Sequence, residues 1–123
     1  MMTLDEYDAF CGSLRHASHV VQWGDASVWK VAGKVFAIGG WQNEDETLHV
    51  TFKVSEMSYD LLKGQTGCRL APYLASRGMK WIQRTDETSM NDEGLKDYLS
   101  ESYRLVSLGF SKKKQKELGL NQV

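Results

Sequence analysis

The sequence predicts an α+β fold, in which an antiparallel β-sheet carries helices packed on one face. Segments near both ends of the chain place apolar residues at helical spacing, whereas segments between them alternate apolar and polar residues as strands do. The 123 residues suit one domain, and no repeat or Pro/Gly-rich linker divides them. We therefore predict a single domain over residues 1–110, followed by a basic, solvated tail over 111–123.

The first predicted element is a helix over residues 4–15. Thr3 and Glu6 fit a capping box, in which each side chain accepts from a backbone N–H that a helix start leaves unpaired. A short strand over 19–23 follows and ends where Gly24 permits a turn.

The next predicted element is a hairpin with strands over 28–31 and 34–39. Ala32-Gly33 forms its two-residue turn, because glycine readily adopts the positive φ that such a turn requires. Counting back from the turn places Trp29 opposite Phe36. The face expected to meet the helices then carries Trp29, Val31, Phe36 and Ile38.

The second half of the chain completes the sheet and adds two helices. Residues 48–54 alternate apolar and polar side chains, which predicts a strand with one buried and one open face. The other predicted elements are a helix over 56–63, a turn or short helix over 70–77, a strand over 79–84, and a helix from Asn91 or Asp92 to about 108.

Charge is unevenly distributed, although the formal net charge is only −1. Residues 28–85 hold eight basic residues against five acids, whereas residues 86–110 hold two against six. The predicted sheet is therefore basic and the helices beside it are acidic. This asymmetry permits a local anionic partner, but it is weaker than in a dedicated nucleic-acid-binding protein.

We expect no enzymatic activity, since no serine lies in a GxSxG elbow and His16 and His19 suit a helix C-terminus. No cofactor or metal is expected either. The acidic loop 42–46 lacks the alternating ligands and central glycine of a calcium loop, and no glycine-rich phosphate loop opens a helix.

Cys11 and Cys68 are isolated, and the chain opens on an acidic, amphipathic segment. These features predict reduced thiols and a cytoplasmic location. No apolar run is long enough to predict a membrane span.

Basic residues interleaved with aromatic ones are the remaining candidates for function. They lie in or beside the predicted sheet: Lys30, Lys34, Lys53, Arg69, Arg77, Lys80 and Arg84. On an exposed face they would contact phosphates. The alternative is a solvated sheet face whose lysines prevent aggregation through strand edges. Base stacking by tryptophan is less favoured than core packing, because Trp29, Trp41 and Trp81 follow the apolar phase of their strands.

Four stretches of the sequence resemble the MmcQ/YjbR family, in the family's order and over nearly the whole chain. They are VVQWGDASVWKVAGKVFAIGGW (20–41), FKVSEMSYDLLK (52–63), APYLASRGMKWIQ (71–83) and SYRLVSLGFSKK (102–113). No single stretch is a catalytic signature, but the set together is specific. One departure is Leu70, where the family pattern has proline.

The resemblance implies a bacterial cytoplasmic domain with a CyaY-like, or double-wing, fold, of a family whose members are named as DNA-binding. The family's lysines fall on four residues that the charge pattern also selects: Lys30, Lys34, Lys53 and Lys80. The leading hypothesis is a non-enzymatic DNA-binding protein of weak to moderate, salt-dependent affinity, using the open sheet face. Its expected phosphate contacts are Lys30, Lys34, Lys53, Lys80, Arg84 and Arg77.

Two other hypotheses stay open. A protein- or ligand-binding adaptor would use the same face, with Trp23, Trp41 and Tyr73 around a groove. Weak iron binding by acids of the first helix, Asp5, Glu6 and Asp8, is suggested only by the CyaY-like fold, and fold is a poor guide to function. The sequence does not specify the oligomeric state.

Overall fold

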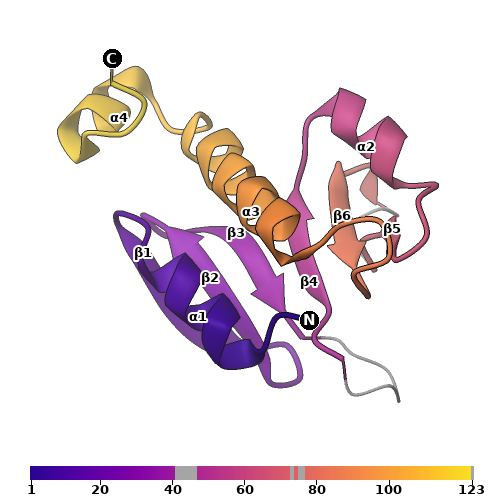
Figure 1. Ribbon diagram of the computed structural model, residues 1–123. Helices are drawn as coiled ribbons and strands as arrows, with labels where there is room; N and C mark the ends of the chain where they lie inside the picture. The colour runs from indigo at the N-terminus through magenta and orange to yellow at the C-terminus, as the bar shows by residue number, and fades with distance from the viewer. Residues whose placement is uncertain (41–46, 73, 75–76, 123) are drawn as a thin grey trace.

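The computed structural model describes residues 1–40, 47–72, 74 and 77–122. These residues form one six-stranded antiparallel sheet and four helices, which confirms the α+β class (Figure 1). The strand order is β1-β2-β3-β4-β6-β5. In chain order the elements are α1 (Leu4–Gly12), β1 (Ala17–Gln22), β2 (Ala26–Val31), β3 (Lys34–Gly39), β4 (Val50–Lys53), α2 (Glu56–Leu62), β5 (Cys68–Leu70), β6 (Trp81–Arg84), α3 (Asp92–Ser107) and α4 (Lys112–Leu118).

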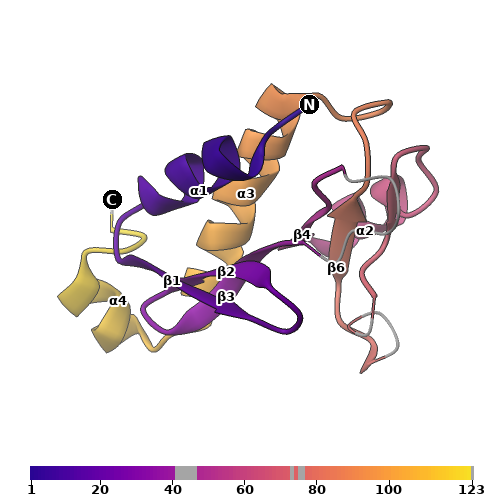
Figure 2. The ribbon, with the colours of Figure 1, turned by 90° about the horizontal axis from the view of Figure 1, so that it is seen from below.

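Helices α1 and α3 cover the same face of the sheet, as Figure 2 shows. The main core lies between them and the strands, and it includes Tyr7 and Cys11 from α1 and Leu95 and Leu99 from α3. Helix α2 lies beside β6, and α4 lies beyond the β1–β3 end of the sheet. No helix of the described residues is long and apolar enough to cross a membrane.

The predicted helix starts are confirmed at atomic detail. The Thr3 hydroxyl accepts from the Glu6 amide while the Glu6 carboxylate accepts from the Thr3 amide. At the start of α3, the Asn91 side chain accepts from the Gly94 amide at 2.8 Å. These caps satisfy donors that the first turn of a helix cannot pair by itself.

The β2–β3 hairpin confirms the predicted turn but corrects the face predicted for Ile38. Ala32 and Gly33 have φ of 46° and 90°, and Val31 pairs with Lys34 as counted from the turn. A β-bulge then shifts the register, so that Trp29 pairs with Ala37 and not with Phe36. Because one extra residue reverses the alternation beyond it, Ile38 lies on the face opposite Trp29.

The end of β3 leaves no room for a side chain at Gly39. A Cβ atom built on Gly39 would lie 2.5 Å from Cε2 of Tyr7, whose ring is fully buried. The Tyr7 hydroxyl also donates to the Ser27 carbonyl at 2.9 Å, which fixes the ring against β2 and β3. Glycine at this position therefore lets α1 approach the sheet closely.

The sheet is divided where β3 and β4 separate. The two strands pair from Gly39–Val50 to Ala37–Phe52. Beyond that point the buried Ser102 hydroxyl of α3 bridges them, accepting from the Lys53 amide at 2.8 Å and donating to the Phe36 carbonyl at 2.7 Å. A side chain thus completes hydrogen bonds that the strands no longer make with each other.

Two described segments differ from the prediction. Strand β5 is a three-residue edge strand that the sequence reading did not include. Residues 112–118, predicted as a solvated tail, form the helix α4. The predictions for Trp41, the loop 42–46 and Tyr73 lie outside the described residues.

Candidate nucleic-acid interface

We call the sheet face turned away from α1 and α3 the outer face. Val28 pairs with Ile38 on this face, and both pack with Leu74 in a cluster separate from the main core. Thr51 pairs with Gln83 there, and both side chains are fully buried. The outer face is therefore only partly open, which corrects the expectation of a fully open face.

The strands carry basic residues without any acid. Their sequences contain no Asp or Glu, and the five Lys and Arg residues are Lys30, Lys34, Lys53, Arg69 and Arg84. Lys30 follows Val28 by two residues in β2, and Lys53 follows Thr51 by two in β4, so both side chains point to the outer face. Both are half-buried.

Arg69 joins the same face through a polar ladder across three strands. Its Nε donates to Oε1 of Gln83 at 2.7 Å, and Nε2 of Gln83 donates to the Thr51 hydroxyl at 3.1 Å. These bonds hold the guanidinium at the β5 edge of the outer face. The sequence reading placed Arg69 beside the sheet but not among the binding residues, because a three-residue strand gives too little alternation to orient it.

Lys34 and Lys80 do not lie on the outer face. The Lys34 ammonium is 4.7 Å from the centre of the Phe110 ring and 3.4 Å from the Gly109 carbonyl, at the end of α3. The Lys80 ammonium lies 4.5 Å from the centre of the Tyr59 ring of α2. Arg77 is exposed on the segment that precedes β6.

Arg84 is a core residue, so the expectation that it contacts phosphate is wrong. It is fully buried, and its guanidinium donates to the Met90 carbonyl at 3.0 Å and to the Asp92 carboxylate at 3.1 Å. Burial alone would raise the pKa of Asp92, but the hydrogen bond and charge of Arg84, with the amide of Met2, hold that pKa below its usual value.

A serine, a histidine and an aspartate meet between α1, β1 and β2, which the sequence reading did not anticipate. The Ser27 hydroxyl donates to Asp8 at 2.6 Å, and Nε2 of His19 lies 2.7 Å from the same hydroxyl. The indole of Trp29 also donates to Asp8, at 2.9 Å. These hydrogen bonds tether α1 to β1 and β2.

The acids proposed for iron binding are engaged elsewhere or separated. Glu6 caps its own helix and Asp8 binds Ser27 and Trp29, while Asp5 is exposed. In the described part of the chain, no three His, Cys, Asp or Glu side chains are grouped so that they could hold a metal ion.

Both cysteines are buried and unbridged. Burial raises the pKa of the Cys11 and Cys68 thiols, and the charge of Asp8 adds to the effect at Cys11. The thiolate, which is the reactive form, is therefore disfavoured at both positions.

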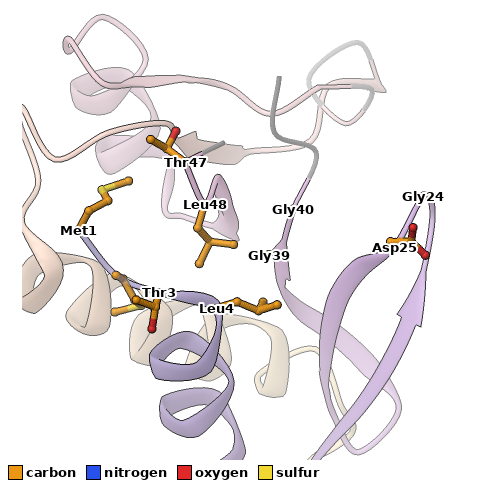
Figure 3. A pocket seen from close by; sticks show the side chains of 10 residues that line it. Met1, Thr3, Leu4, Gly24, Asp25, Gly39, Gly40, Thr47 and Leu48 are labelled. Atoms are coloured by element: carbon orange, nitrogen blue, oxygen red, sulfur yellow. The ribbon is translucent and has the colours of Figure 1, made fainter. Parts of the chain in front are cut away.

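A pocket of about 590 Å³ lies between the start of α1, the β1–β2 turn and the end of β3 (Figure 3). Its large side chains are apolar, from Met1, Met2, Leu4 and Leu48, and Asp25 contributes a carboxylate at the rim of the turn. Its lining also includes Gly40 and Thr47, which flank residues 41–46. No cluster of basic residues lines this pocket among the described residues, so it is distinct from the outer face.

A family model described as YjbR matches residues 12–105. The chain belongs to the YjbR family. The matched range runs from the last residue of α1 into α3, so it contains every strand of the YjbR-family sheet and leaves α4 outside.

Solved structures share this YjbR-family fold. A Deinococcus radiodurans protein, DR2400, with a DUF419 domain, is 26% identical with a TM-score of 0.82, over 98% of this chain and 90% of its own. A Pseudomonas syringae protein is 15% identical with a TM-score of 0.68, over 85% of this chain and 99% of its own. Among curated proteins, none matches the chain.

Proposed function

We propose that this YjbR-family protein binds duplex DNA through cations on the outer face. The observation that carries the proposal is the absence of acids from all six strands, together with Lys30, Lys53 and Arg69 on the outer face. Arg77 extends this set on the exposed segment before β6. The four cations define the outer-face site: Lys30, Lys53, Arg69 and Arg77.

Electrostatics favours a polyanion at this site. Among the described residues, none of the ion pairs involves Lys30, Lys53, Arg69 or Arg77. Their positive charges are therefore not neutralised by a neighbouring carboxylate, and a phosphate backbone would release counterions on binding them.

Side-chain burial favours duplex DNA over a single strand. Recognition of single strands relies on exposed aromatic rings that stack on bases. Trp81, the tryptophan of β6 on this face, is only 5% exposed, which also confirms its predicted place in the core. Gln83 of the outer face is fully buried and its amide bonds to Arg69 and Thr51, so it does not reach a base edge and sequence preference is expected to be weak.

The proposal predicts that reversing two outer-face charges weakens DNA binding. Fluorescence anisotropy with a labelled 24-base-pair duplex, from about 25 to 200 mM salt, would compare wild type with Lys30→Glu/Lys53→Glu. We expect the variant to lose about tenfold or more in affinity at 100 mM salt. We also expect the slope of log K against log salt to become shallower by about 2, one for each lost phosphate contact.

Lys63→Glu/Lys96→Glu provides the matched control, because it makes the same charge change on the helices. These lysines pair with Asp60 and Glu93 at the surface, and turning each pair into a like-charged one costs only about 0.2–0.5 kcal/mol, so the control is expected to stay folded. If the control binds the duplex as weakly as the outer-face variant does, net charge alone explains the loss of affinity, and the outer-face site is refuted. Absence of wild-type binding at 25 mM salt would refute DNA binding altogether.

A protein-binding adaptor is the second candidate, supported by apolar side chains at the β1 edge of the sheet. Val21 is 56% exposed and Trp23, at the tip of the β1–β2 turn, is 51% exposed. A partner protein could add a strand to the edge strand β1 and cover these exposed apolar side chains. If the duplex titration shows no binding, this edge becomes the surface to test.

A further inference from the structure

Helix α4 is fixed to the body of the protein. Ser111 caps its start by accepting from the Lys114 amide, and Gly119 ends it with a φ of 69°. Nε2 of the buried Gln115 donates to the Phe110 carbonyl at 2.8 Å, and Nε2 of His16 donates to the Leu118 carbonyl at 2.7 Å. The backbone that carries the lysines of α4 is therefore held in place and does not form a solvated tail.

Cations from three parts of the chain gather around this helix. Lys34 of β3 and Lys114 of α4 both lie against the Phe110 ring, at 4.7 and 4.6 Å from its centre. The Arg15 guanidinium packs on Gly119, where an added Cβ would lie 3.0 Å from Nη1. We call the six cations the α4 surface: Arg15, Lys34, Lys112, Lys113, Lys114 and Lys116.

Folding accounts for only part of this charge arrangement, through the contacts of Lys34 and Lys114 with the Phe110 ring. Lys112 and Lys116 are four residues apart on one side of the helix, and such like-charged pairs destabilise a helix by about 0.2–0.5 kcal/mol. The first turn carries lysines, although the helix dipole favours acids there. Among the described residues no ion pair involves any cation of the α4 surface. A cluster that the fold leaves unneutralised indicates an anionic partner.

The side chains around the cluster favour a phosphate backbone as that partner. The Phe110 ring is only 9% exposed and two lysines lie against it, so it offers no platform on which a base could stack. The exposed positions of α4 are lysines and Glu117, which gives no apolar side chain to insert into a lipid surface.

We propose that the α4 surface is a second site for the duplex phosphate backbone, adding affinity without reading sequence. This inference rests on the proposed DNA binding and extends its footprint. In Figure 2, α4 lies at the β1–β3 end of the molecule, whereas β4 and β6 lie at the other end. A duplex that crosses the outer face and continues past the β2–β3 turn reaches both sets of cations.

The test adds Lys112→Glu/Lys113→Glu to the duplex titration, beside wild type, Lys30→Glu/Lys53→Glu and Lys63→Glu/Lys96→Glu. Glutamate in the first turn of a helix is favourable for the dipole, so the α4 variant is expected to remain folded, and circular dichroism checks this. We expect it to bind about tenfold or more weaker than the control at 100 mM salt, with a salt slope shallower by about 2.

The outcomes separate the two proposals. If the α4 variant binds like the control while the outer-face variant is weakened, the α4 surface is refuted and the outer-face site stands. If only the α4 variant is weakened, the outer-face site is refuted and the α4 surface stands. Absence of wild-type binding at 25 mM salt refutes both.

Discussion

Replacing Arg84 with methionine should lower the free energy of unfolding by about 2–4 kcal/mol. The variant keeps an apolar stem in the core, but the Met90 carbonyl loses its guanidinium donor and the Asp92 carboxylate keeps the Met2 amide while losing the charged guanidinium. Breaking a buried ion pair usually costs about 3–5 kcal/mol. The Asp92 side chain is 31% exposed and regains water, which places the loss toward the lower end of that range.

Urea denaturation followed by tryptophan fluorescence measures this loss, with Arg77→Met as the matched control. Arg77 is exposed, so its replacement should change stability by about 0.5 kcal/mol or less. Equal stability of the two variants would contradict a structural role for Arg84.

The pH dependence of stability provides an independent test of how much the Arg84–Asp92 ion pair contributes. Because the folded pKa of Asp92 is lowered, its contribution is complete above the unfolded value of about 3.9 and is lost as pH falls through the folded pKa. As the pH falls below about 4, the free energy of unfolding of wild type should therefore decrease more than that of Arg84→Met. The difference in stability between the two proteins should shrink. Parallel curves for the two proteins would show that the pair contributes no pH-dependent stability.

Replacing Ser102 with alanine should also cost about 2–4 kcal/mol of unfolding free energy. The hydroxyl serves two buried backbone groups, and each unsatisfied group costs about 1–3 kcal/mol. The loss should appear as a lower midpoint of thermal or urea unfolding.

Ser100→Ala is the control for this substitution, because Ser100 is exposed on the same helix. Alanine favours a helix slightly more than serine does, so the control should be neutral or slightly stabilised. A similar loss in both variants would refute the bridge between β3 and β4 as the cause.

Local signals in the sequence predicted much of the fold. The capping box at Thr3, the cap at Asn91 and the Ala32-Gly33 turn depend only on neighbouring residues, and all three occur in the structure. The β-bulge near Trp29 could not be predicted in this way, because counting residues back from the turn assumes an unbroken register. The face assigned to Ile38 was wrong for that reason.

The candidate site was less predictable, because it depends on which way each strand residue points. Trp81 and Ile82 are adjacent, apolar and both buried, so the alternation in β6 does not reveal that Arg84 faces the core. In α4 the run of lysines conceals a helix whose buried residue is Gln115, with Leu120 buried just beyond its end. Its local signals, Ser111 before the run and Gly119 after it, were present in the sequence.

The separation of charge between strands and helices also determines how molecules of this protein meet in solution. Helices α1 and α3 carry seven acids against two basic residues, whereas the strands carry no acid and place Lys30, Lys53 and Arg69 on the outer face. A net charge of −1 therefore describes a strongly dipolar particle. At low ionic strength the acidic side of one molecule attracts the basic side of the next, and salt screens that attraction over a Debye length of about 10 Å at 0.1 M. We therefore expect added salt to weaken the attraction between molecules, which static light scattering would detect as an increasing second virial coefficient.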